Sequence, residues 1–121
     1  MVNDDIDELE KHWIDVGLLS SFDESRERQY NDIGLFKAMY EGSVVFIGMA
    51  REIKNGGLGK RIRDFTRDTE SARSHPAGKL LHSKMTEVRI YILTIPDRES
   101  ICKIRRSFIT RYNPLWNRNK S

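Results

Sequence analysis

The spacing of apolar residues in the N-terminal quarter of the chain predicts a helix. Asn3, followed by two aspartates, is a favourable helix start. Apolar residues then recur at helical spacing for about four turns, at Ile6, Leu9, Trp13 and Val16. We expect an acidic amphipathic helix that packs on the domain through this stripe. Residues 20–32 are polar and aperiodic, which indicates a connector.

Two short runs of strand character follow the connector. Residues 34–40 (GLFKAMY) and 43–48 (SVVFIG) are joined by Glu41 and Gly42, a pattern typical of a β-hairpin. Residues 87–95 (EVRIYILTI) predict a third strand. The expected fold class is α+β, a small three-stranded antiparallel sheet flanked by helices, with an added N-terminal helix. Residues 1–32 should form the acidic helix and connector, and residues 33–121 the domain proper.

Three more helices are predicted between and after these strands. Leu58, Ile62 and Phe65 fall at i, i+4 and i+7, which places a helix over residues 58 to about 68. A short helix is expected within residues 77–85. The last helix should begin at Asp97 and stop before Asn113. Its inner stripe consists of Ile101, Ile104, Phe108 and Ile109.

Length and composition indicate one compact domain in water. The chain has 121 residues, and no stretch approaches the roughly 20 apolar residues that a membrane span needs. The N-terminus lacks the basic start and apolar run of a secretion signal, so we expect a cytoplasmic protein without membrane contact. Its single Cys102 cannot form an internal disulfide and is interpreted as a small core residue.

The net charge of +3 conceals a strong asymmetry. Residues 1–35 hold three Lys/Arg against ten Asp/Glu, a balance of −7, and residues 36–121 hold eighteen against eight, a balance of +10. A basic body attracts polyanions, and phosphate neutralisation is the usual sequence-independent source of nucleic-acid affinity. A merely soluble, charged surface would show the same balance.

Two arginines stand at positions that the helical pattern turns inward. Arg105 lies between Ile101 and Phe108 in the apolar stripe of the last helix, and Arg61 lies beside the stripe of its own helix. A buried guanidinium must be paired, or must open onto a cleft that holds an anion. The two arginines therefore indicate a shared phosphate-sized site. Pairing with a local carboxylate, such as Asp64 or Glu99, is the alternative.

Four segments in order resemble the GIY-YIG nucleases. Residues 34–36 (GLF) and 46–48 (FIG) resemble the two signature tripeptides of that family, and GLGKRIRDF resembles its arginine helix, with Arg61 at the catalytic arginine. RRSFITRYNPLWN resembles the closing segment, with Asn117 at the terminal asparagine. The resemblance covers residues 33–117 and implies a nuclease-like fold that contacts DNA or RNA.

The chain departs from the family at most catalytic positions. Phe36 and Phe46 replace the two tyrosines, so no hydroxyl is present to help activate water. Met49 and Phe65 stand where a basic residue and a His or Tyr base are common. The metal-binding glutamate of the last helix corresponds to Arg105. A guanidinium cannot ligate Mg²⁺, so we expect no metal site and no cofactor.

Arg105 could instead offer its positive charge to a phosphodiester, which would retain binding and lose cleavage. No other residue is a strong substitute: Glu99, Glu87 and Asp64 are poorly placed, and neither His75 nor His82 has an orienting carboxylate in sequence. The predicted binding surface is basic and lies mainly between the hairpin and the third strand. Its residues are Lys60, Arg61, Arg63, Arg67, Arg73, His75, Lys79 and Arg105.

Three functions remain open from the sequence. The first is a degenerate nuclease fold that binds DNA or RNA through the phosphate backbone, without cleavage. The second is an active, divergent endonuclease, which would need Mg²⁺ and a carboxylate ligand. The third is a protein-interaction subunit that uses the acidic segment of residues 4–16. That segment could also cover the arginine groove as an internal mimic of a polyanion.

Overall fold

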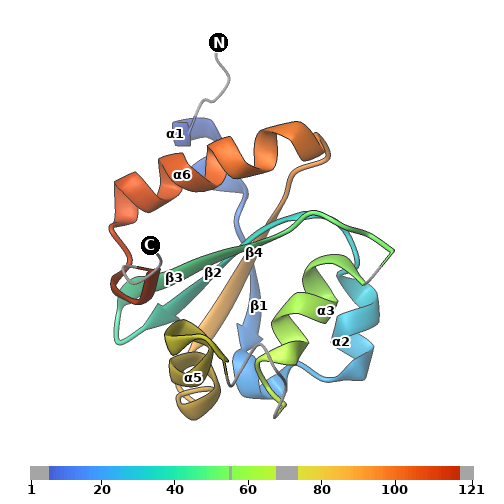
Figure 1. The fold of residues 1–121 in the computed structure, drawn as a ribbon, viewed down its shortest axis with the longest axis vertical. Helices are drawn as coiled ribbons and strands as arrows, with labels where there is room; N and C mark the ends of the chain where they lie inside the picture. The colour runs from blue at the N-terminus through green and yellow to red at the C-terminus, as the bar shows by residue number, and fades with distance from the viewer. Residues whose placement is uncertain (1–5, 55, 68–73, 118–121) are drawn as a thin grey trace.

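A four-stranded antiparallel sheet forms the centre of the protein (Figure 1). The computed structural model describes residues 6–54, 56–67 and 74–117. The strand order is β1-β4-β2-β3, so β1 and β3 are the edges. The strands are β1 (Ile14–Leu18), β2 (Gly34–Tyr40), β3 (Ser43–Ala50) and β4 (Arg89–Thr94). The α+β class is confirmed, and the sheet has one strand more than the predicted three.

Helices cover both faces of this sheet (Figure 1). The α-helices are α1 (Ile6–Leu9), α2 (Glu24–Gln29), α3 (Gly57–Asp64), α5 (Pro76–Ser83) and α6 (Ile101–Tyr112). Short 3₁₀ turns are η1 (Glu10–His12), η2 (Leu19–Ser21), η3 (Arg98–Ser100) and η4 (Leu115–Asn117). None of the helices in the described ranges is long and apolar enough to cross a membrane.

Alternation along β2 divides the apolar side chains into two cores. Phe36 and Ala38 belong to the core under α3 and α5, whereas Leu35 belongs to the core under α6. Strand β2 is hydrogen-bonded to β3 on one side and to β4 on the other, and a core covers each of its faces. All its residues from Gly34 to Ala38 are therefore buried. A central strand with both faces covered is expected to be apolar on both faces.

Close packing in the hairpin explains the glycine of the FIG tripeptide. Gly48 pairs with Phe36 across the two strands. A Cβ atom at Gly48 would lie 2.5 Å from the Phe36 ring and 3.0 Å from the Phe46 ring. The Phe36 ring is itself only 1% exposed, so it has little room to move aside.

The predicted N-terminal helix is much shorter than expected. Helix α1 has four residues, η1 follows, and the chain is already a strand at Ile14. Val16, the last residue of the predicted stripe, is buried as part of β1. The prediction was wrong beyond Trp13 because pairing with β4 outweighs local periodicity. Gly17, at φ 96°, lies at an irregularity in the β1–β4 register. Residues before the predicted boundary at 32/33 thus contribute a strand to the same sheet.

The predicted connector contains helix α2. The Asp23 side chain caps this helix by accepting a hydrogen bond of 3.0 Å from the Arg26 amide. None of the residues of α2 is buried, so no apolar stripe marked the helix in the sequence. Arg63 of α3 reaches back to Glu27 of α2 at 2.8 Å, and Gly59 allows the two helices to approach closely.

A buried lysine joins the N-terminal segment to the sheet. Lys37 is 8% exposed, and its ammonium group lies 4.6 Å from the Trp13 ring centre, 5.0 Å from that of Tyr112 and 5.2 Å from that of Tyr91. The ammonium donates to the Tyr112 hydroxyl at 3.2 Å and lies 3.6 Å from the Glu10 carboxylate. Burial lowers the pKa of Lys37, and the charge of Glu10 offsets part of this effect. These five residues are called the Lys37 cluster.

The acidic side chains of the N-terminal segment are bound on the α6 side of the sheet. Arg111 of α6 forms ion pairs with Asp7 and Glu10, and the Tyr112 hydroxyl donates to Glu10. Ile6, Leu9 and Trp13 pack against the core under α6. The expected packing of this apolar stripe is therefore confirmed for residues 6–13, whereas residues 1–5 lie outside the described ranges.

We predict that Gly48→Ala destabilises the protein by about 1–3 kcal/mol, because the added methyl group overpacks the core between two aromatic rings. Urea unfolding of both proteins measures the difference in the free energy of unfolding. Ser43→Ala, an exposed position of the same strand, is the control and should change stability far less. Equal stability of Gly48→Ala and wild type would contradict the packing described for this hairpin.

A second prediction concerns alkaline pH. Burial raises the pKa of Tyr112, and the hydrogen bond to Glu10 and its charge raise it further. The folded state thus holds the phenolic proton more tightly than the unfolded state, so this contribution is complete below the ordinary pKa of about 10 and is lost as pH rises above it. Between about pH 8 and about pH 11, wild type should lose more unfolding free energy than Tyr112→Phe. Parallel losses would show that the phenol does not contribute.

Candidate nucleic-acid interface

A polar pocket of about 340 Å³ opens where β3 ends and α3 begins. The buried residues Leu58 and Ile62 fix α3 against the sheet, and this turns Arg61 toward solvent. Arg51 reaches the same pocket from the segment that follows β3. We call this site the arginine pocket. It is lined by Ala50, Arg51, Glu52, Gly57, Lys60, Arg61 and Asp64.

Both carboxylates of the arginine pocket are already paired with other cations. Asp64 accepts from Lys60 at 3.0 Å and from Arg67 at 3.3 Å. Glu52 pairs with Arg98 at 3.3 Å. Cations other than Arg51 and Arg61 thus balance the negative charges of both carboxylates, which leaves the pocket with a net positive charge.

The two arginines of the pocket have no partner of their own among the described residues. Arg61 is exposed and forms no hydrogen bond or ion pair with them. The Nε atom of Arg51 is buried and lacks a hydrogen-bond acceptor within the same ranges. An unsatisfied buried donor costs about 1–3 kcal/mol. An oxyanion in the pocket would accept hydrogen bonds from the terminal guanidinium nitrogens and would offset both positive charges.

Arg105 and Asn117 meet at the outer edge of β3, at Ile47. The Asn117 carboxamide accepts from the Ile47 amide at 2.8 Å and donates to the Ile47 carbonyl at 3.1 Å. Arg105 Nε donates to that carbonyl at 3.3 Å. Asn117 therefore replaces a neighbouring strand at the edge of the sheet.

Arg105 is a half-buried cation with no carboxylate partner in the described part of the chain. Burial lowers the pKa of Arg105, and nearby Cys102 offsets part of this effect. Cys102 itself is half-buried and contacts Met49 at 3.8 Å. The alternative, in which Arg105 pairs with Glu99, is not formed, so the positive charge of Arg105 remains available beside the β3 edge.

The structure does not bring Arg61 and Arg105 into one pocket. Helices α3 and α6 lie on opposite faces of the sheet (Figure 1). Arg105 is absent from the residues that line the arginine pocket, and Arg61 faces solvent rather than the core. The second cation of that pocket is Arg51. Sequence reasoning missed it because Arg51 follows a strand and belongs to no apolar stripe.

Phe36 and Phe46, the residues at the expected tyrosine positions, are packing residues. Their ring centres are 5.8 Å apart, and those of Phe36 and Phe65 are 6.2 Å apart. The Phe46 and Phe65 rings meet edge to face at 6.4 Å. His82 donates from Nδ1 to the Phe65 carbonyl at 2.9 Å, which places this histidine in a structural contact.

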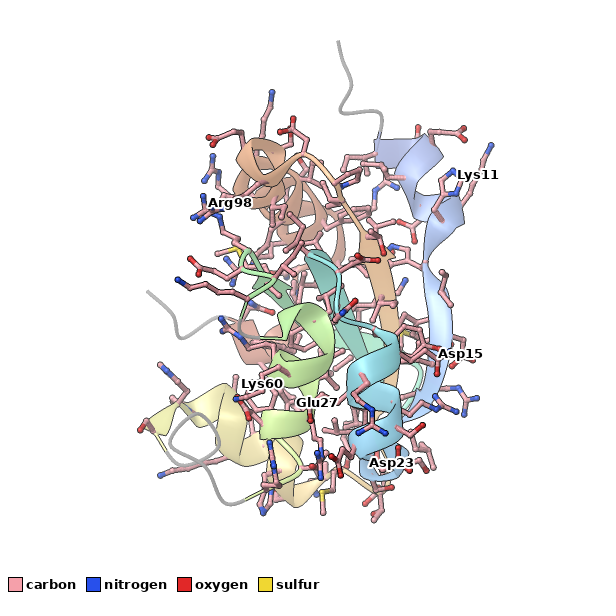
Figure 2. All side chains as sticks on the ribbon, turned by 90° about the vertical axis from the view of Figure 1, so that its right-hand side faces the viewer. Lys11, Asp15, Asp23, Glu27, Lys60 and Arg98 are labelled. Atoms are coloured by element: carbon pink, nitrogen blue, oxygen red, sulfur yellow. The ribbon has the colours of Figure 1, made fainter. Side chains whose placement is uncertain are left out.

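The other predicted binding residues have different environments. Lys60 and Arg67 pair with Asp64, and Arg63 is half-buried against Glu27. Figure 2 shows Lys60 and Glu27 on the neighbouring helices α3 and α2, away from Lys11 on the N-terminal segment. His75, which precedes α5, and Lys79 on that helix are exposed. Arg73 lies outside the described ranges.

The described residues contain no group of three or more His, Cys, Asp or Glu side chains that could hold a metal ion. At the position where the resemblance implies a metal-binding glutamate, the half-buried guanidinium of Arg105 stands instead. A cation does not ligate Mg²⁺, so these residues do not fit the metal site of the family.

No family model matches the sequence of this chain, and no match is found among curated proteins.

We predict that Asn117→Leu exposes the edge of β3. The Ile47 amide loses its acceptor, so its hydrogen exchange should become faster, and the protein should lose about 1–3 kcal/mol of stability. Hydrogen exchange followed by NMR measures the individual amides. The amide of Leu35, which lies in the central strand, is the internal control. Unchanged exchange at Ile47 would contradict the contact with Asn117.

Proposed function

We propose that the protein binds DNA or RNA through the phosphate backbone, with the arginine pocket as the primary contact. The observation that carries this proposal is the presence of two arginines, Arg51 and Arg61, without partners among the described residues, in a pocket whose carboxylates are paired elsewhere. Guanidinium groups donate several hydrogen bonds in one plane and match the geometry of phosphate oxygens.

The distribution of charge supports a polyanionic ligand. Residues 36–121 carry a balance of +10. Two acidic residues of the N-terminal segment, Asp7 and Glu10, pair with Arg111 and Lys37 on the α6 side of the sheet. Residues 6–12 therefore do not cover the arginine pocket on the α3 side.

The same geometry favours binding without cleavage. No hydroxyl is present at Phe36 or Phe46, whose rings pack against Phe65. Arg105 replaces a carboxylate with a cation, and the carboxamide of Asn117 is occupied by Ile47. We therefore infer a degenerate relative of the GIY-YIG nucleases. The motif-like segments form a hairpin, a helix and a final helix in the expected order, which supports this relationship.

Fluorescence anisotropy with labelled oligonucleotides tests the proposal. Arg51→Ala and Arg61→Ala should each weaken binding about 5- to 20-fold, and each should reduce the slope of log affinity against log salt by about one. The matched control is Arg28→Ala, which removes the same charge from an exposed arginine that forms an i,i+4 pair with Glu24. That variant should bind nearly as wild type does.

The same samples, incubated with Mg²⁺ or Mn²⁺ and with EDTA, are also examined for cleavage. Salt-sensitive binding without cleavage is the expected result. Cleavage that requires the metal and disappears in Arg61→Ala would instead establish an active endonuclease. Absence of binding, or equal effects of all three arginine substitutions, would overturn the proposed site.

A further inference from the structure

A second hollow lies at the opposite end of β3 from the arginine pocket. It has a volume of about 510 Å³, and its lining residues come from the hairpin turn, the end of α6 and η4. We call it the aromatic hollow. It is lined by Tyr40, Glu41, Ser43, Val44, Val45, Tyr112, Asn113, Leu115 and Trp116.

The lining of the aromatic hollow suits an uncharged flat group. The Tyr40 and Trp116 rings are 5.5 Å apart, and Leu115 leaves 58% of its surface exposed although it is apolar. Among the described residues that line the hollow, Glu41 alone is charged. Its carboxylate repels a phosphate, whereas Ser43 and Asn113 offer polar groups to the edge of a base.

The edge of β3 connects the two sites. From Val44 in the aromatic hollow to Ala50 in the arginine pocket the strand advances six residues, a span of about 20 Å. Arg105 lies between them at Ile47. A cationic pocket, a half-buried arginine and an aromatic hollow thus follow one another along the length of β3.

We infer that this edge binds a single strand of nucleic acid, with phosphates at the arginine pocket and at Arg105 and an unstacked base in the aromatic hollow. The inference rests on the proposed function and specifies its substrate class. In a duplex the faces of the bases are stacked and cannot enter a hollow, whereas a single strand can expose them. The span corresponds to a site on the order of four nucleotides.

Anisotropy titrations compare labelled single strands of about eight nucleotides with duplexes of equal length and with single strands that carry abasic sites. Intact single strands should bind at least about fivefold more tightly than the abasic strands, which keep the phosphates and lose the bases. They should also bind more tightly than the duplex. Arg105→Gln should weaken binding of the intact and the abasic strands alike.

Leu115→Ala isolates the aromatic hollow without a change in charge. This substitution should weaken binding of the intact strand about threefold and leave the abasic strand unaffected, because it shortens only the apolar wall. The matched control is Ile14→Ala, an exposed apolar residue on β1, the opposite edge of the sheet. It should leave both affinities unchanged.

The possible failures can be distinguished. The single-strand inference is overturned if the duplex binds as tightly as the intact strand, and if neither removal of the bases nor Leu115→Ala weakens binding. Arg51- and Arg61-dependent affinity would in that case still support the proposed function. If no oligonucleotide binds, both fail together.

Discussion

The pairing of β2 with a strand on each side is the constraint on which the rest of the structure depends. Because β2 is central, its alternating side chains must be covered on both faces, and this requires α6 on one side and α3 with α5 on the other. On the face under α3 and α5, Gly48 has no side chain and so admits the Phe36 ring. Of the two edge strands, β1 and β3, the candidate site lies along β3.

The edge of β3 has two requirements that the same residues meet. Its outward backbone groups need hydrogen-bond partners, and an unprotected edge invites pairing with another chain. Asn117 satisfies Ile47 with a side-chain amide, and Arg105 adds a charged donor to the same carbonyl. A charge placed there hinders association with a second sheet and at the same time faces the region in which a polyanion would lie.

Local patterns predicted most of the elements between residues 34 and 112, because strands and helices there carry clear alternation or apolar stripes. They failed where tertiary contacts decide. Strand β1 forms because β4 needs a partner, and α2 has no buried residue to reveal it. The sequence singles out Arg61 and Arg105 as candidate anion-binding residues, but the sheet separates them. Arg51 and the burial of Lys37 were missed, since both depend on segments that meet only in the folded chain.

The Lys37 cluster also affects the biosynthesis of the protein. Glu10 has its partners at Lys37 and Tyr112, and among the described strands β1 pairs only with β4, so residues 10–18 need contacts that form after residues 89–112 are made. Domains generally fold as units during synthesis, and contacts of long sequence separation form late. A nascent chain would therefore leave the ribosome with a lysine in the middle of its apolar central strand still uncovered, and only the final helix completes the cover. Closure of this core therefore follows the synthesis of α6.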